Sequence, residues 1–134
     1  MKSLLISVHP EHCAKLLTSE KIAELRRTEP KQEFDGRIFI YNTGTKQIEI
    51  KAVLSSIIKA DYGEIEKRYL KFISITPDQL RQYSHGKINA YLLVFFAVMK
   101  LSEACTIEKM LSNGITPPQS YLYFNPEQLG IIEN

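Results

Sequence analysis

Over five short segments, apolar and polar residues alternate or apolar residues run together, which predicts β-strands. These segments are Leu4–Val8, Lys21–Arg27, Arg37–Asn42, Gln47–Ile58 and Tyr121–Phe124. In the second of them Ile22, Glu24 and Arg26 share one face, because successive strand residues point to opposite sides. The alternation in the fourth slips at Val53, which indicates a bulge or a bend there.

A longer apolar segment lies in the second half of the chain. Ala90–Leu101 is nearly all apolar and rich in aromatic and β-branched residues, which favours a strand buried on both faces. A buried helix is the alternative, because periodicity alone does not separate the two structures.

Helix signals lie between the predicted strands. Pro10 suits the first turn of a helix that fades near Ser19. The residues of this helix expected to face water are Glu11, His12 and Lys15. Further helices are predicted from Asp61 with Glu64, from Thr76 with Gln79, and over Thr106–Ser112. Strands with helices inserted between them indicate an α+β fold, and the length suits one domain over residues 1–134.

The net charge, the two cysteines and the length of the apolar runs limit which ligands and which cellular location are expected. The net charge of +2 is too small for bulk electrostatic binding of duplex nucleic acid, so a nucleic-acid ligand would need a local pocket. Cys13 and Cys105 lack the spacing of metal ligands and the density of a disulfide scaffold, which indicates reduced thiols and a cytoplasmic location. No signal peptide is visible and the longest apolar run, residues 90–99, is too short to cross a bilayer, so no membrane partner is expected.

Several segments carry a resemblance to the ASCH domain family of the PUA-like superfamily. Ser19–Arg26 is similar to the family's Gly-x-Lys-x-x-Glu-x-Arg pattern, with Ser19 in place of the usual glycine. Residues 36–43 resemble its glycine, strand and Tyr-x-Thr stretch, and residues 83–94 its later helix end and buried strand. The tail at residues 117–121 is similar to that of small bacterial and phage members. The order and spacing of these segments, which cover most of residues 3–101, carry the resemblance.

This resemblance implies both a fold and a ligand class. The expected fold is a PUA-like small β-barrel of about five or six strands, with helices after the first strand and before the long late strand. The resemblance also implies a cleft beside the first helix, which Lys21, Glu24 and Arg26 line or approach. Family members are regarded as RNA-binding or RNA-associated, so RNA, a nucleotide or a nucleoside is the expected partner.

Lys21 has two interpretations. Its neighbours Leu17 and Ile22 can shield its ammonium group from water, which suits a base or a phosphate contact. The alternative is a solvated lysine in a salt bridge with Glu20 or Glu24.

Glu24 and Arg26 also have two interpretations. Because they leave the same face of a strand, they can read a base edge together: the carboxylate accepts from an amino group and the guanidinium donates to a carbonyl or phosphate. The alternative is a structural ion pair that closes the barrel.

Three more residues are candidates for the cleft. Tyr41 can stack on a base, although a half-buried packing role is the commoner one. Ser7 and His9 end the first strand near the expected cleft, where His9 suits a helix cap equally well. No metal site and no cofactor are predicted, since His12 and His85 have no carboxylate or cysteine at ligand spacing.

Catalysis depends on a comparison within the family. One bacterial subgroup hydrolyses the amide of N-acylated cytidine with a lysine, a threonine and a glutamate. Lys21 matches that lysine, but Glu24 stands at the threonine position and residues 72–75 contain no acid. We therefore expect a non-catalytic RNA- or nucleotide-binding domain without an assigned catalytic residue, Lys21 and Glu24 being the candidates if the chain is an enzyme. An amidohydrolase for N-acylated cytidine or a related nucleoside and a regulatory protein-interaction domain are the alternatives.

Overall fold

Within residues 1–131, which the computed structural model describes, the chain forms six strands, five α-helices and one 3₁₀-helix. The strands are β1 (Ser3–Val8), β2 (Ala23–Arg26), β3 (Arg37–Asn42), β4 (Gln47–Asp61), β5 (Asn89–Thr106) and β6 (Leu122–Phe124). The helices are α1 (Pro10–Leu17), α2 (Tyr62–Arg68), α3 (Leu70–Ile73), α4 (Pro77–Ser84), α5 (Ile107–Ser112) and the 3₁₀-helix η1 (Pro126–Leu129). The predicted strands are all present, and the long apolar segment is a strand rather than a helix.

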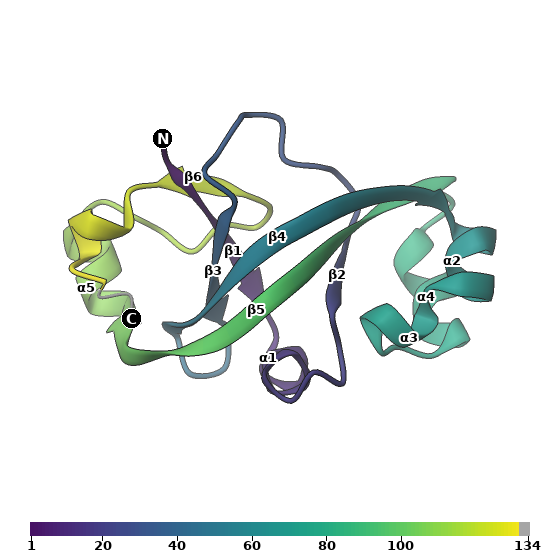
Figure 1. Cartoon of the computed structure of the whole chain (residues 1–134), viewed down its shortest axis with the longest axis horizontal. Coiled ribbons are helices and arrows are strands. Elements are labelled where there is room, and N and C mark those ends of the chain that lie inside the picture. Colours follow the sequence, from purple (N-terminus) through teal and green to yellow (C-terminus); the bar gives the residue numbers. More distant parts are fainter. Residues whose placement is uncertain (132–134) are drawn as a thin grey trace.

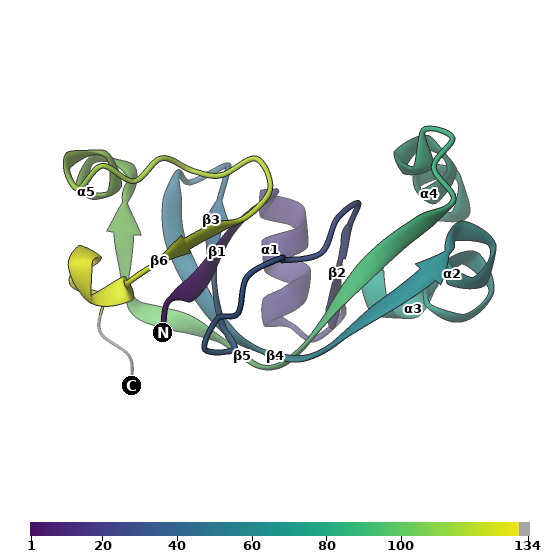
Figure 2. The same ribbon diagram turned by 90° about the horizontal axis from the view of Figure 1, so that it is seen from above.

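The six strands form one sheet in the order β2-β5-β4-β3-β1-β6. β1 runs parallel to β3, whereas the other neighbours are antiparallel. The sheet is strongly curved (Figures 1 and 2), but its two edge strands, β2 and β6, are not hydrogen-bonded to each other in the described part of the chain. The α+β class and the number of strands are confirmed, and the term barrel applies only loosely because the sheet stays open.

β4 and β5 form a long ribbon that crosses the whole molecule (Figure 1). Their register shifts at three places, one of them between Lys51 and Val53, where the sequence predicts a bulge. The expectation that β5 is buried on both faces is wrong beyond Phe95, since Phe96 is 57% and Met99 44% exposed. In the described chain no element covers this outer side of the ribbon (Figure 1), so these apolar side chains face water.

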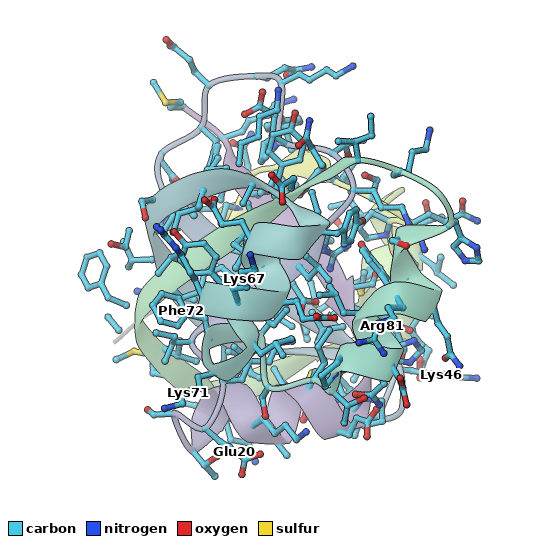
Figure 3. All side chains as sticks on the ribbon, turned by 90° about the vertical axis from the view of Figure 1, so that its right-hand side faces the viewer. Glu20, Lys46, Lys67, Lys71, Phe72 and Arg81 are labelled. Carbon is cyan, nitrogen blue, oxygen red and sulfur yellow. The ribbon has the colours of Figure 1, made fainter. Side chains whose placement is uncertain are left out.

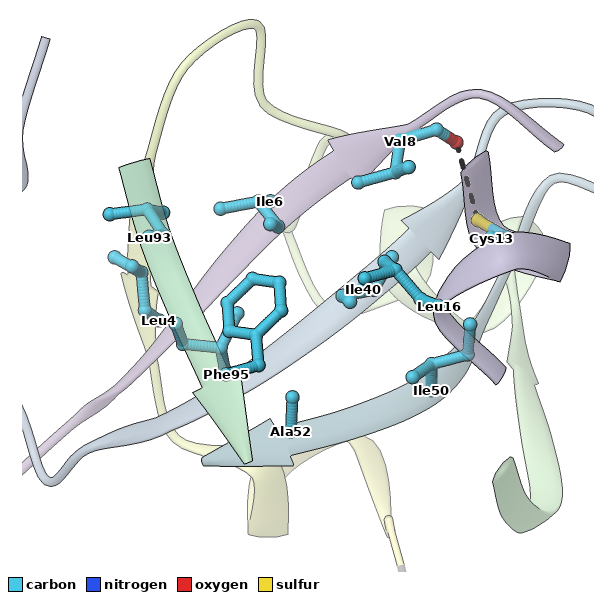
Figure 4. Close-up of a cluster of buried hydrophobic side chains, with 11 residues drawn as sticks. Leu4, Ile6, Val8, Cys13, Leu16, Ile40, Ile50, Ala52, Leu93 and Phe95 are labelled. Atoms are coloured by element: carbon cyan, nitrogen blue, oxygen red, sulfur yellow. Dashed lines mark hydrogen bonds between the residues drawn. The ribbon is translucent and has the colours of Figure 1, made fainter. Parts of the chain in front are cut away.

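α1 packs against the inner side of the sheet because its apolar residues lie on one face. Cys13 and Leu16 are buried against Val8, Ile40 and Ile50 in one apolar cluster (Figure 4). The Cys13 thiol also donates to the Val8 carbonyl oxygen over 3.6 Å. The helix is thereby fixed beside the end of β1.

The helices between β4 and β5 gather at one end of the ribbon (Figures 1 and 3). Asp61 accepts from the Glu64 amide, and Thr76 and Gln79 form a complete capping box, as their spacing predicts. The backbone of Ile22 donates to the Phe72 carbonyl oxygen over 2.9 Å, which holds α3 beside the start of β2. The opposite end carries α5 and η1. None of the helices within residues 1–131 has the length and apolar character needed to cross a membrane.

Candidate functional site

A cavity of about 540 Å³ lies at the end of β1, where the edge of β1 that faces away from β3 has no partner strand among the described residues. β6 pairs with β1 only over Ser3–Leu5, so the rest of β1 faces β2 across a gap. The walls come from β1 and α1, from β2, from α4 and its preceding loop, and from the segment before β6. Its principal lining residues are Ser7, His9, His12, Glu24, Arg26, Arg27, Thr43, Gln79, Tyr83 and Pro118. The volume is in the range of small-ligand pockets.

One carboxylate at the floor of the cavity lies between two cations, of which one lines the cavity and the other lies behind it. Glu24 Oε1 lies 3.0 Å from Lys21 Nζ, and Glu24 Oε2 lies 3.3 Å from Arg26 Nη2. The three side chains are only 2%, 11% and 13% exposed for Lys21, Glu24 and Arg26. Ionised, the group carries a net charge of +1, because one carboxylate balances only one of the cations. Glu24 and Arg26 therefore form an ion pair, and both also line the cavity.

Lys21 lies behind the cavity wall rather than in it. Besides Glu24, its ammonium group donates to the Ile73 carbonyl oxygen over 3.0 Å and contacts His12 Nδ1 at 3.3 Å. The three donors of an ammonium group thus each have a partner. Of the two sequence interpretations, the salt bridge with Glu24 is present but the lysine is not solvated.

His12 points toward this group and lines the cavity, so the expectation that it faces water is wrong. An ammonium group can only donate, so His12 Nδ1 accepts from Lys21 and the ring proton of the neutral imidazole lies on Nε2. Burial, and then the charge of Lys21, lower the pKa of His12 below its ordinary value. The cavity therefore presents a neutral imidazole N–H at pH 7.

We expect the pKa of His12 to lie below the ordinary 6.5 when its ring signals are followed by NMR. The unfolded chain then takes up the proton first, so stability contributed by the neutral ring is complete above pH 6.5 and is lost as the pH falls below it. Glu24 and Glu11 act against the shift and Lys15 adds to it, without reversing it. A His12→Asn variant should show a flatter dependence of unfolding free energy on pH between about 7.5 and 5. An observed His12 midpoint at or above 6.5 would contradict this electrostatic picture.

Arg26 bridges the gap that no strand fills. Its Nη2 donates to the Ser7 carbonyl oxygen over 2.7 Å, so a side chain of β2 satisfies the unpaired backbone of β1. Ser7 Oγ in turn donates to the Pro118 carbonyl oxygen over 2.7 Å. The Arg26 guanidinium also lies over the Tyr121 ring, 5.9 Å from its centre, while its buried Nε has no hydrogen-bond partner among the described residues.

Arg27, Tyr83 and Thr43 also line the cavity, although the sequence does not mark them as candidates. Arg27 donates twice to the Tyr83 carbonyl oxygen, at 2.9 and 3.3 Å, and its guanidinium lies 4.1 Å from the centre of the Tyr83 ring. Tyr83 anchors the wall by donating from its hydroxyl to the Leu25 carbonyl oxygen. On the opposite side Thr43 Oγ1 lies 3.4 Å from His9 Nδ1, and His9 makes no side-chain helix cap.

Tyr41 is not among the residues that line this cavity. It is 4% exposed and packs with Phe39 and Phe124 in a separate apolar cluster. Burial raises the pKa of its hydroxyl. No three His, Cys, Asp or Glu side chains of residues 1–131 gather in a way that would hold a metal ion.

Comparison with solved structures defines the class of fold. The crystal structure of ASCH from Zymomonas mobilis matches with a TM-score of 0.85 at 24% identity, covering 96% of this chain and 92% of that one. A variant of the same protein with one tyrosine replaced by phenylalanine matches with a TM-score of 0.86 at 23% identity, covering 97% and 95%. The fold of this chain is that of an ASCH domain.

Sequence similarity also extends along nearly the whole chain. A curated protein of Zymomonas mobilis named ASCH domain-containing ribonuclease is 28% identical over 130 residues, which are 95% of this chain and 87% of that protein. No family model matches. With the shared fold, this similarity bears out the resemblance to ASCH domain proteins seen in the sequence.

Proposed function

We propose that this chain binds single-stranded RNA and that the cavity between β1 and β2 receives one of its nucleotides. The observation that carries the proposal is the buried cluster of Lys21, Glu24 and Arg26, whose net positive charge lies at the floor of a cavity. A fixed, poorly solvated cation favours a phosphate or a base carbonyl, and low local dielectric strengthens that attraction. We also propose that residues 1–134 act as one ASCH domain.

Three features support RNA over other anions. The volume of about 540 Å³ accommodates a nucleotide-sized ligand. Tyr83 and Arg27 offer planar surfaces on which a base can stack, and the neutral His12 offers an N–H donor. The name of the relative from Zymomonas mobilis points to RNA as the substrate of that protein. The cytoplasmic location predicted from the cysteines agrees with binding of RNA. This location stays a prediction.

The geometry favours binding over hydrolysis of an acylated cytidine. A lysine acts as a base only through an unshared electron pair, and the three donors of Lys21 are engaged with Glu24, Ile73 and His12. Both carboxylate oxygens of Glu24 are likewise engaged, one with Lys21 and one with Arg26. The protein-interaction alternative predicts instead that nucleotides leave the cavity residues undisturbed.

RNA cleavage is the second candidate function. His9 and His12 lie three residues apart at the start of α1 and both line the cavity, so two imidazoles can face one phosphodiester. The relative named as a ribonuclease favours this candidate. Incubation of a short RNA followed by mass spectrometry should then give cleavage products that disappear in both His9→Ala and His12→Ala. RNA that stays intact at a protein concentration that saturates binding would remove this candidate while leaving binding in place.

We expect Arg27→Glu to weaken binding of a tetranucleotide RNA by about fivefold at low salt, because it reverses a charge at the cavity mouth. Fluorescence anisotropy with a labelled RNA measures the change. Arg68→Glu is the matched control: Arg68 is also exposed, lies on α2 away from the cavity, and its replacement changes the net charge equally. Equal affinities of the two variants would show that RNA responds to overall charge rather than to this cavity.

A further inference from the structure

A second hollow, of about 300 Å³, adjoins the proposed nucleotide cavity. It is lined by two stretches of chain, residues 28–32 and residues 120–123. Both stretches continue directly from residues of the first cavity, Arg27 on one side and Gln119 on the other. The two hollows therefore lie along one cleft between the segment after β2 and the segment before β6.

Two side chains, Arg26 and Tyr121, separate the two hollows. Arg26 lines the first cavity and lies over the ring of Tyr121, which lines the second. The Tyr121 hydroxyl donates to the Thr28 carbonyl oxygen over 2.6 Å, which fixes the ring. Burial raises the pKa of that hydroxyl, so it stays a donor.

Tyr123 supplies a second fixed ring in this hollow. Its hydroxyl oxygen accepts from the Gln32 amide over 2.9 Å, and its ring meets Phe34 edge-on with centres 6.5 Å apart. Rings held in this way lose little conformational freedom when a ligand stacks on them. Fixed aromatic rings beside a cationic groove are the arrangement by which proteins hold successive bases of a single strand.

The charges of the second hollow differ from those of the first. Lys31 and Glu29 both line it, so its side chains are neutral in sum, in contrast to the +1 of the cluster at Glu24. Stacking rather than net charge is therefore the main attraction there. Lys31 is exposed at this position and is the cation available to a phosphate that joins two nucleotides.

We infer that the second hollow is a subsite for the neighbouring nucleotide of the same RNA strand, which stacks on Tyr121 and Tyr123 while Lys31 contacts the linking phosphate. This inference rests on the proposed function, because the first nucleotide must occupy the cavity at Arg26. It goes further in predicting that the protein recognises a dinucleotide unit.

Titration calorimetry with uridine 3′-monophosphate and with the dinucleotide UpUp tests the inference. The wild-type protein should bind UpUp about tenfold more tightly than the monophosphate, through one additional stacked base. Tyr123→Leu should remove most of this gain and Lys31→Glu should reduce it about threefold, while both leave binding of the monophosphate within about twofold. Lys100→Glu, an exposed lysine on β5 outside both hollows, is the control with the same charge change. UpUp is checked for cleavage by mass spectrometry after each titration.

The outcomes separate this inference from the proposed function. Equal affinity for the two ligands, or a full gain retained in Lys31→Glu and in a folded Tyr123→Leu, would overturn the second subsite while binding of the monophosphate stands. If Tyr123→Leu does not fold, Lys31→Glu against Lys100→Glu decides the matter. Binding of neither ligand would overturn the proposed function and the subsite together.

Discussion

Replacing Glu24 by glutamine is expected to lower the free energy of unfolding by about 3 kcal/mol. Its carboxylate is the shared partner of Lys21 and Arg26, and the three side chains are at most 13% exposed. Glutamine keeps the shape but leaves two buried cations without a counter-charge, and an unpaired buried charge is far more costly than a lost surface pair. Urea denaturation of the wild type and of Glu24→Gln measures the difference.

Glu66→Gln provides the matched control for this loss. Glu66 also pairs with an arginine, Arg81, at 3.1 Å, but the two side chains are 38% and 62% exposed, so the expected change is below about 1 kcal/mol. In a double-mutant cycle, Lys21→Met should make Glu24→Gln less costly, because one of the two uncompensated cations is then absent. A loss below about 1 kcal/mol in Glu24→Gln, or strict additivity with Lys21→Met, would show that the cluster does not behave as a buried charge network.

Arg26→Met is expected to weaken RNA binding by at least about tenfold while the protein stays folded. Methionine preserves much of the volume, and Lys21 and Glu24 remain as a neutral pair, so the net charge at the cavity floor is lost. The logarithmic dependence of affinity on salt should also become shallower by about one unit, since one phosphate contact is removed. Anisotropy titrations at several salt concentrations measure both quantities.

A control variant and a stability measurement distinguish a loss of RNA binding from a loss of folded structure. Arg68→Met removes an exposed arginine outside the cavity and should leave affinity and salt dependence nearly unchanged. The Ser7 carbonyl oxygen loses its donor in Arg26→Met, so the unfolding free energy should fall by about 1 kcal/mol without loss of the fold. A folded Arg26→Met variant with the affinity of the wild type would contradict the role of this cation in binding.

Most helices and strands could be predicted from the sequence, because strand alternation and helix caps depend on residues close together in the chain. Pro10 does begin α1, and Thr76 with Gln79 does cap α4. Helix ends are predicted less well. The signal at Asp61 predicts one helix, whereas the structure has two, α2 and α3, separated at Tyr69. The open sheet was not predictable, because closure depends on how the edge strands meet in space.

For the cavity, sequence reasoning identifies residues that share a motif but not those that tertiary structure brings in. Ser7, His9, Glu24 and Arg26 line one cavity, whereas Lys21 is buried behind its wall. Tyr83 and Pro118 come from distant segments, and their roles depend on contacts with β2 and β1 that no local pattern encodes.

His12 and Tyr41 show two further reasons why the site differs from the expectation. The three-residue spacing of His9 and His12 places both on the same side of the first turn of α1, a signal that could have pointed to His12. Tyr41 does lie on a strand, as predicted. Because β3 is buried on both faces over residues 38–42, the alternation of its side chains does not tell which face meets a ligand.

NMR titration of the isotope-labelled protein with a tetranucleotide RNA shows whether an RNA nucleotide occupies the cavity between β1 and β2. We expect salt-dependent shift changes at Ser7, His12, Arg26 and Arg27, which line the cavity. Lys67 on α2 and Lys71 on α3 (Figure 3), neither of which lines the cavity, should stay unchanged and serve as the internal reference. Shift changes confined to the surroundings of Lys67 and Lys71, or no changes at saturating RNA, would contradict binding in this cavity.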